Sequence, residues 1–175
     1  EGHTAAARQA AFSPDGQRLV TVGEDKQVIV WDFARRERLK AFTDHTALVS
    51  SVAFSPDGKW FATSSNDQTV IVWDAERLQK VAVLRGHQSP VFSVTFSPDG
   101  RWLASASGNT ILWRVGSWEK SAEIPHGIGE AGTVLFSPNS QRLMFHSGDP
   151  PNTWDVATGQ PVGEEFDLAW AGNNV

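Results

Sequence analysis

The sequence predicts an all-β fold that is built from about four copies of one repeated unit. The pentapeptide Phe-Ser-Pro-Asp-Gly begins at Phe12, Phe54 and Phe96, and a weaker copy begins at Phe136, so the spacings are 42, 42 and 40 residues. Self-similarity at such a period is typical of repeat architectures. Apolar runs of four to six residues recur between turn signals, which is an all-β pattern. We therefore expect units at 1–42, 43–84, 85–124 and 125–165, with a further repeat starting at 166–175.

Four strands are expected in each unit, and the second repeat shows them most clearly, at Leu48–Ser55, Trp60–Ser64, Val70–Asp74 and Gln79–Leu84. A Ser-Pro-Asp-Gly turn separates the first two strands, because proline presets φ and glycine accepts a positive φ. The third strand is apolar on both alternating faces, so neighbouring sheets should cover it from both sides. The fourth strand is more polar and is expected at the outer edge of its sheet.

Composition excludes several classes of partner and site. The net charge of −5 and the pI near 5.5 argue against a nucleic-acid or anionic-membrane surface, because phosphate binding needs clustered Lys and Arg. The densest basic stretch, residues 35–40, is typical of an edge strand that is kept soluble by charge. No apolar run approaches the roughly 20 residues of a membrane-spanning helix. With no cysteine the chain can form no disulfide and no thiolate metal site, which fits a reducing compartment and favours a cytoplasmic location.

Polar residues also recur in register with the pentapeptide. A histidine lies nine residues before its phenylalanine, a tryptophan lies nineteen after it, and an aspartate lies six before the tryptophan. A buried indole N–H and a buried imidazole both need partners, which a hydroxyl and a carboxylate can supply. We therefore expect a hydrogen-bonded tetrad in each repeat. The members are His3, Thr21, Asp25 and Trp31, then His45, Thr63, Asp67 and Trp73, then His87, Ser105 and Trp113.

The dipeptides Gly86-His87, Trp31-Asp32, Trp73-Asp74 and Trp154-Asp155, at this period, resemble the signatures of the WD-repeat β-propeller family. The resemblance covers essentially the whole chain. It implies four-stranded antiparallel blades around a central channel, with one tetrad inside each blade, and a role in holding other proteins together. Such rings have roughly four to eight blades, most often seven, so the chain is expected to be an incomplete segment of a longer protein. The open blade edges of such a segment would favour self-association. The uniform spelling of the pentapeptide resembles that of bacterial members of the family.

The third repeat departs from the family pattern. Only 17 residues separate its pentapeptide phenylalanine from Trp113, and Ser107–Thr110 is predicted to form a tight hairpin. No aspartate stands six residues before Trp113, so we expect His87 to be satisfied by Ser105 and water. Trp113 is followed by Arg114 in place of the usual aspartate.

The fourth repeat is predicted to be degenerate. Its dipeptide is reversed at His126-Gly127, Phe145 replaces the hydroxyl residue, and Asp149 precedes two prolines. His146 lies near Asp149, but one imidazole and one carboxylate are too few ligands for a zinc site. The aspartates of the Pro-Asp-Gly turns are interpreted as turn residues, and no phosphate loop or nucleophile elbow occurs. We therefore expect no metal, no cofactor and no catalytic residue.

Tryptophans outside the tetrads divide into two groups. Trp60 and Trp102 follow their turns at matching places, which predicts packing. Trp118 and Trp170 have no counterpart in the other repeats, and the sequence predicts no role for them.

Variable positions on the expected docking face are the candidates for partner binding. The resemblance implies that this face holds the positions three and five residues after the loop histidine and the one before the turn aspartate. A large apolar side chain with a polar rim is the usual anatomy of an interface anchor, which favours Leu48 and Phe92. The alternative, that either one lines the channel or packs under a loop, stays open. The full set is Ala6, Arg8, Glu24, Leu48, Ser50, Asn66, Pro90 and Phe92.

These patterns favour a non-catalytic scaffold that presents loop residues on a rigid face to a protein or peptide partner. Two alternatives stay open. The chain could be a targeting or regulatory arm of a signalling enzyme, such as a kinase or protease. It could also be an enzymatic propeller that binds a small molecule at the channel mouth, but only Arg8 and Glu24, from one blade, offer titratable groups there.

Overall fold

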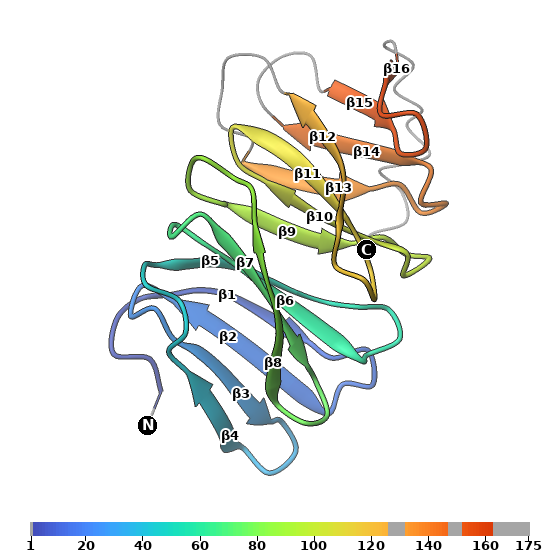
Figure 1. Cartoon of the computed structure of the whole chain (residues 1–175). Coiled ribbons are helices and arrows are strands. Elements are labelled where there is room, and N and C mark those ends of the chain that lie inside the picture. Colours follow the sequence, from blue (N-terminus) through green and yellow to red (C-terminus); the bar gives the residue numbers. More distant parts are fainter. Residues whose placement is uncertain (1, 126–131, 147–151, 163–175) are drawn as a thin grey trace.

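The computed structural model describes residues 2–125, 132–146 and 152–162, which form four separate antiparallel sheets of four strands each (Figure 1). Within every sheet the strands lie side by side in chain order. The all-β prediction is thus confirmed. The first sheet contains β1 (Ala7–Phe12), β2 (Arg18–Gly23), β3 (Val28–Asp32) and β4 (Glu37–Phe42), and the second contains β5 (Val49–Phe54), β6 (Trp60–Ser65), β7 (Thr69–Asp74) and β8 (Gln79–Arg85).

The other two sheets follow the same plan with shorter strands. All four strands predicted in the second repeat end within one residue of β5 to β8. The tight hairpin predicted in the third repeat is also present, because β10 ends at Ala106 and β11 begins at Asn109. The third sheet contains β9 (Ser93–Phe96), β10 (Trp102–Ala106), β11 (Asn109–Arg114) and β12 (Lys120–Pro125), and the fourth contains β13 (Thr133–Phe136), β14 (Arg142–His146), β15 (Asn152–Asp155) and β16 (Pro161–Val162).

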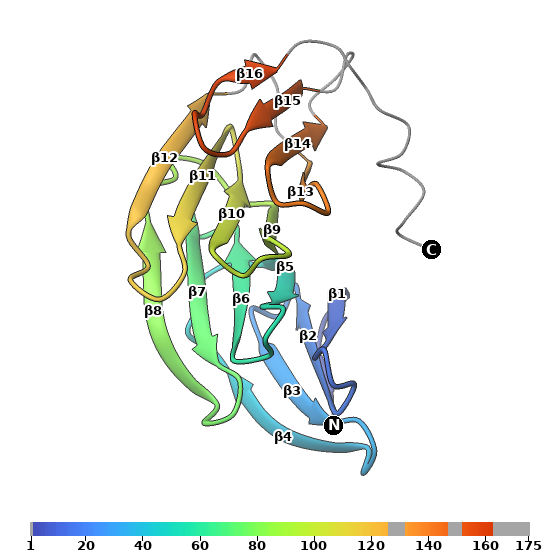
Figure 2. The ribbon, with the colours of Figure 1, turned by 90° about the vertical axis from the view of Figure 1, so that its right-hand side faces the viewer.

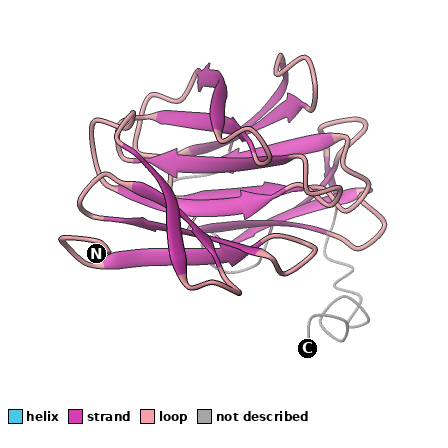
Figure 3. Ribbon diagram, turned by 90° about the horizontal axis from the view of Figure 1, so that it is seen from below, coloured by secondary structure: helices cyan, strands magenta, loops and turns pink. Residues whose placement is uncertain are grey.

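The four sheets are arranged as blades of an arc (Figure 2). Strands β1, β5, β9 and β13 line the concave side, each packed against the next, and β4, β8 and β12 lie on the convex side. Seen from below, the described residues contain only strands and loops (Figure 3). Accordingly, no helix in this part of the chain is long and apolar enough to cross a bilayer. The edge position predicted for the fourth strand of a repeat is confirmed, since β4 and β8 are both edge strands with mostly exposed residues.

The hydrophobic core is divided into three clusters, one at each junction between adjacent sheets. Strand β7 is buried along its whole length and contributes to two of these clusters, with Ile71 and Trp73 on one side and Val70 and Val72 on the other. Its predicted cover by both neighbouring sheets is therefore confirmed. Each junction buries side chains from both of its sheets, so each sheet depends on its neighbours for stability.

Side-chain hydrogen bonds also join the inner strands of adjacent sheets. Each inner strand is the edge of its own sheet, so some of its N–H groups have no partner within that sheet. A polar side chain at one repeated position of the preceding sheet accepts a bond from such a group. The bonds run from the Val52 N–H to Gln9 Oε1 (2.8 Å), from the Val94 N–H to Ser51 Oγ (3.3 Å) and from the Val134 N–H to Ser93 Oγ (3.4 Å).

Candidate functional site

The second sheet holds a hydrogen-bonded chain of four side chains. Trp73, on β7, donates its indole N–H to Thr63 Oγ1, on β6, at 3.0 Å. The same hydroxyl lies 2.9 Å from His45 Nε2, and His45 Nδ1 lies 2.8 Å from Asp67 Oδ2. Since the carboxylate only accepts, His45 donates through Nδ1 and accepts the threonine proton at Nε2. His45, Thr63 and Trp73 are buried away from water, so their polar atoms depend on these hydrogen bonds for partners.

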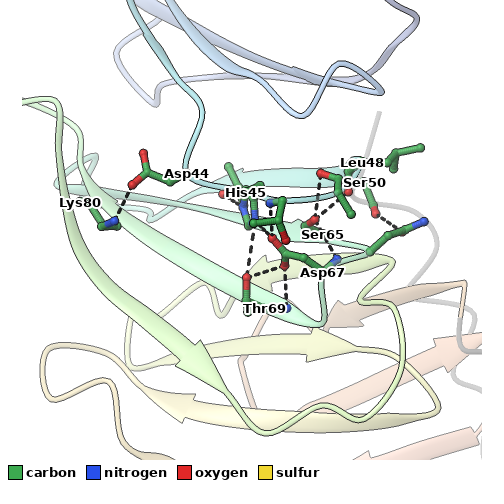
Figure 4. Close-up of polar contacts among 12 residues, drawn as sticks. Asp44, His45, Leu48, Ser50, Ser65, Asp67, Thr69 and Lys80 are labelled. Carbon is green, nitrogen blue, oxygen red and sulfur yellow. Dashed lines mark hydrogen bonds and ion pairs between the residues drawn. The ribbon is translucent and has the colours of Figure 1, made fainter.

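Asp67 connects these hydrogen-bonded side chains to the loop that precedes β5 (Figure 4). Its carboxylate also accepts from the Thr46 N–H at 3.0 Å and from both the N–H and the hydroxyl of Thr69, at 3.0 and 2.6 Å. Burial raises the pKa of Asp67, but the bonds from His45, Thr69 and Thr46 outweigh it and hold the pKa well below its usual range. The loop is thus fixed to the β6–β7 turn by a charged anchor.

The first sheet repeats the arrangement. His3 Nδ1 lies 2.9 Å from Asp25 Oδ1, and His3 Nε2 lies 2.9 Å from Thr21 Oγ1. Trp31 donates its indole N–H to the same hydroxyl at 2.9 Å. The Thr4 N–H donates to Asp25 at 2.8 Å, as Thr46 does to Asp67. The loop before β1 is therefore held as the loop before β5 is.

The third sheet corrects one expectation. Trp113 and His87 share Ser105 Oγ, at 2.8 and 2.7 Å, but the second nitrogen of His87 does not depend on water, because Asn109 Oδ1 lies 2.9 Å from Nδ1. The Asn109 amide also donates to Glu123, which turns its oxygen toward His87. Burial lowers the pKa of His87, and the bond to Asn109 offsets this only in part.

Asn109 was missed because the acidic position was counted back from the tryptophan. Counted from the histidine, the spacing is constant: Asp25, Asp67 and Asn109 each stand 22 residues after their own histidine. The two residues that the third repeat lacks fall between Asn109 and Trp113. A count from the histidine would have found the amide.

The loops that carry these histidines and the turns that carry the acidic residues lie at one end of the sheets, here called the loop face. Antiparallel strands in chain order place these segments together, and the bonds from histidine to Asp or Asn join them. In the first sheet Arg8 pairs with Glu24 at 2.8 Å, both being exposed, and Ala6 is exposed beside them. These three of the predicted docking residues are thus brought together.

In the second sheet the Ser50 hydroxyl donates to Asn66 Oδ1 at 3.2 Å, and the Leu48 carbonyl accepts from the Asn66 N–H at 2.9 Å. Figure 4 shows the Leu48 side chain pointing away from these polar contacts. In the third sheet Pro90 and Phe92 are half-buried, and the Phe92 N–H donates to the Ala106 carbonyl at 2.9 Å. The three sheets therefore present different side chains at these positions of the loop face.

A model of the WD domain, G-beta repeat family matches residues 1–32, 36–74 and 78–113, which together make up more than half of the chain. The chain belongs to the WD-repeat family. The match includes all three tetrads and the loops that they hold.

Comparison with solved structures agrees with this assignment. The WD-repeat chain is similar to the structure of U3-55K, with a TM-score of 0.84 and 18% sequence identity. The similarity covers 93% of this chain and 52% of that one, so this chain spans about half the length of its structural neighbour. In all, 1505 chains of solved structures match, and a fold so widely shared does not by itself identify a partner. A search of curated proteins found no match.

The fourth WD-repeat blade has no complete tetrad in its described part. Phe145 occupies the hydroxyl position and packs 6.0 Å from the Trp154 ring, and the buried indole N–H of Trp154 has no acceptor among the described residues. The predictions that concern His126, Asp149 and Trp170, and the side chain of His146, lie outside the described part. Within that part, no group of three or more His, Asp and Glu could hold a metal ion.

Proposed function

We propose that this WD-repeat segment is a non-catalytic scaffold whose loop face binds a protein or peptide partner. WD-repeat propellers generally mediate protein–protein interactions and are typically non-catalytic. One observation carries the proposal for this chain: hydrogen-bonded tetrads hold the histidine loops against the sheets, while the side chains on those loops differ from sheet to sheet. A rigid frame with variable loops is how binding surfaces are commonly built.

Leu48 and Phe92 are proposed as the apolar anchors of this surface. Both are half-buried, and backbone hydrogen bonds hold the Leu48 carbonyl and the Phe92 N–H in place. Ser50 and Asn66 provide a polar rim beside Leu48. Anchors of this kind, surrounded by polar contacts, dominate the binding energy of many interfaces.

Site-specific photo-crosslinking in the cells that express the protein tests this proposal. Benzoylphenylalanine is placed at position 48 or 92, and position 79, on the convex edge strand β8, is the matched control. We expect one protein adduct from positions 48 and 92 and none from position 79. Phe92→Ala should abolish the adduct at position 48 without changing the melting temperature. Equal adducts from all three positions, or none from 48 and 92, would contradict a docking role for the loop face.

Enzymatic activity is less well supported. Arg8 and Glu24, which come from a single sheet, already pair with each other at 2.8 Å. Convergent titratable groups from several elements are the usual basis for a catalytic proposal. Turnover of a substrate by the complete protein, lost on Arg8→Ala, would overturn the non-catalytic assignment.

We also propose a cytoplasmic location, which the absence of cysteine supports and subcellular fractionation can test.

A further inference from the structure

A second candidate site lies at the opposite end of the sheets from the loop face. A groove of about 970 Å³ separates the third and fourth sheets at their turns. Its walls include Arg101, Trp102 and Arg114 from the third sheet, and Ser140, Asp155 and Val156 from the fourth. Ser140 Oγ accepts from the Asp99 N–H at 3.0 Å, so the two walls are joined at one point.

One repeated turn position of the fourth sheet lacks the side chain that it carries in the earlier sheets. The fourth residue after the WD-type aspartate position adopts a left-handed backbone in the second, third and fourth sheets, with φ of 52° at Leu78, 60° at Trp118 and 66° at Gly159. Each of these three residues donates its N–H to the carbonyl four residues earlier, at 3.0, 2.8 and 2.9 Å, so the turns are equivalent. What differs is the side chain.

Side chains at this position fill the earlier junctions. Leu78 packs against the core between the first two sheets. Trp118 packs between the second and third sheets, with its ring edge-on to Trp60 at 5.7 Å, which gives a role to a tryptophan that the sequence left unexplained. At the third junction Gly159 has no side chain, and nothing lies within 4 Å of the place where a Cβ would be. The slot beside Trp102, the counterpart of Trp60, therefore stays open.

The open slot is flanked by two guanidinium groups. Arg114 replaces the aspartate that caps this turn in the other sheets, and its guanidinium lies 4.9 Å from the centre of the Trp102 ring. The Arg101 side chain is 80% exposed and lies 3.9 Å from Asp99. A guanidinium held on an aromatic ring is well placed to pair with a carboxylate.

The acidic groups of the groove are already engaged. Asp99 accepts from the Ser97 hydroxyl at 2.6 Å and from the Arg101 N–H at 3.0 Å. Asp155 accepts from the Ala157 N–H at 3.1 Å and from the Thr158 N–H and hydroxyl at 2.9 Å each. The net charge of −5 is spread over the chain, and charges more than roughly 8 Å away are largely screened at physiological salt. Arg114 makes no ion pair among the described residues, and Arg101 has only the long contact with Asp99, so the two arginines are the groups of the groove best placed to pair with a carboxylate of a ligand.

We propose that this groove binds an acidic peptide segment of a partner protein. An aromatic side chain of the peptide fills the slot beside Trp102, as Trp118 fills the equivalent slot beside Trp60. Flanking carboxylates of the peptide pair with Arg101 and Arg114. A nucleic acid fits less well, because two guanidiniums on an acidic chain are far from the clustered basic surface that phosphate binding requires. This site lies apart from the loop face and does not depend on it.

Fluorescence anisotropy of a fluorescein-labelled peptide, with one tryptophan between pairs of aspartates, tests the proposal on the full chain. Gly159→Trp should fill the slot and weaken binding at least ten-fold. The matched control is Gly159→Ala, which places the same left-handed strain on the backbone but leaves the slot open, and it should bind as the wild type does. Arg114→Asp restores the usual residue of the turn and should also weaken binding at least ten-fold. A peptide with alanine in place of tryptophan should bind at least ten-fold more weakly.

Three results would overturn the proposal. One is equal peptide binding by the wild type, Gly159→Trp and Arg114→Asp. Another is the absence of binding at millimolar protein concentration. The third is tighter binding of a single-stranded RNA homopolymer that the same variants abolish, which would assign the groove to nucleic acid. If thermal melts show that Gly159→Trp does not fold, the Arg114→Asp and alanine-peptide comparisons decide the outcome.

Discussion

At the scale of single residues, Thr63 is the joint of the best-defined tetrad. Its hydroxyl accepts a hydrogen bond from the indole N–H of Trp73 and donates one to His45, so two buried groups depend on one oxygen. A hydroxyl can accept and donate a hydrogen bond through the same oxygen. The fourth sheet shows the alternative, since Phe145 at this place leaves the Trp154 N–H without an acceptor among the described residues.

Replacing Thr63 with valine keeps the shape but removes the hydroxyl. Each stranded buried group costs about 1–3 kcal/mol, so we expect Thr63→Val, which strands two groups, to lower the free energy of unfolding by about 2–6 kcal/mol, as measured by urea denaturation. The adjacent Ser64→Ala is the control, because the buried Ser64 Oγ has no hydrogen-bond partner among the described residues. Ser64→Ala should leave stability unchanged or raise it. Equal midpoints for Thr63→Val and the wild type would mean that the hydrogen-bonded chain contributes no stability.

Asp67 and His87 are two tetrad groups whose shifted pKa values give stability a definite pH dependence. The folded pKa of Asp67 is lowered, so its contribution is full above the usual aspartate pKa and is lost as pH falls through the folded value. The folded pKa of His87 is also lowered, so the unfolded chain takes up a proton first, once pH falls below about 6.5. We expect the free energy of unfolding to decrease from pH 7 to pH 5 and again below pH 4.

Asn109→Asp isolates the histidine part of this effect. A carboxylate beside His87 favours its charged form and raises its folded pKa toward that of the unfolded chain. The loss of stability between pH 7 and pH 5, followed by urea denaturation at each pH, should therefore become smaller in Asn109→Asp than in the wild type. The same slope in both proteins would show that His87 does not control stability in this range.

At the scale of strands and turns, the sequence predicted the features that depend on neighbouring residues in the chain, such as strand and turn positions. The strands of the second repeat lie where its proline and glycine turns and its doubly apolar third strand placed them. The partner of Trp118 could not be found in this way, because Trp60 belongs to another sheet and no local pattern connects the two. Asn109 keeps the spacing from the histidine that the aspartates of the other repeats have. The shortened hairpin changes its spacing to the tryptophan, which is why the pattern did not predict it.

Trp118 itself can be tested at this scale. Trp118→Gly removes the packing on Trp60 but relieves a left-handed residue, so we expect a net loss of about 1–3 kcal/mol in denaturant unfolding. Arg36→Gly is the matched control, because Arg36 has the same left-handed backbone at φ 57° but is exposed in the first sheet. Arg36→Gly should be neutral or slightly stabilising. If both variants lose the same stability, the backbone and not the junction packing accounts for the effect.

At the scale of the whole molecule, the described residues cover the first sheet on one side only. The pentapeptide phenylalanine is 7% exposed at Phe96 and 9% exposed at Phe136, where a preceding sheet covers it, but Phe12 is 51% exposed. Phe12 packs edge-on to the exposed Phe33 at 4.7 Å, which makes a small apolar surface at this end of the arc. Exposed apolar faces of repeat units favour association.

Light scattering over a concentration series measures the consequence. We expect the mass of the isolated chain to rise above 19.1 kDa with concentration, and Phe12→Glu to keep it monomeric. Val81→Glu is the control, because Val81 is 42% exposed on the convex edge and lies far along the chain from this face. A constant monomer mass for the wild type would show that the uncovered face does not pair between chains.

The left-handed position that closes each turn also has an evolutionary consequence. Leucine, tryptophan, arginine and glycine all occupy it with the same backbone, so its side chain is free to vary without changing the blade. The tryptophan codon becomes a glycine codon by a change of its first base. A single mutation can therefore turn a filled blade junction into an open groove, or the reverse, so that WD-repeat proteins can gain and lose lateral binding sites independently of their loop faces.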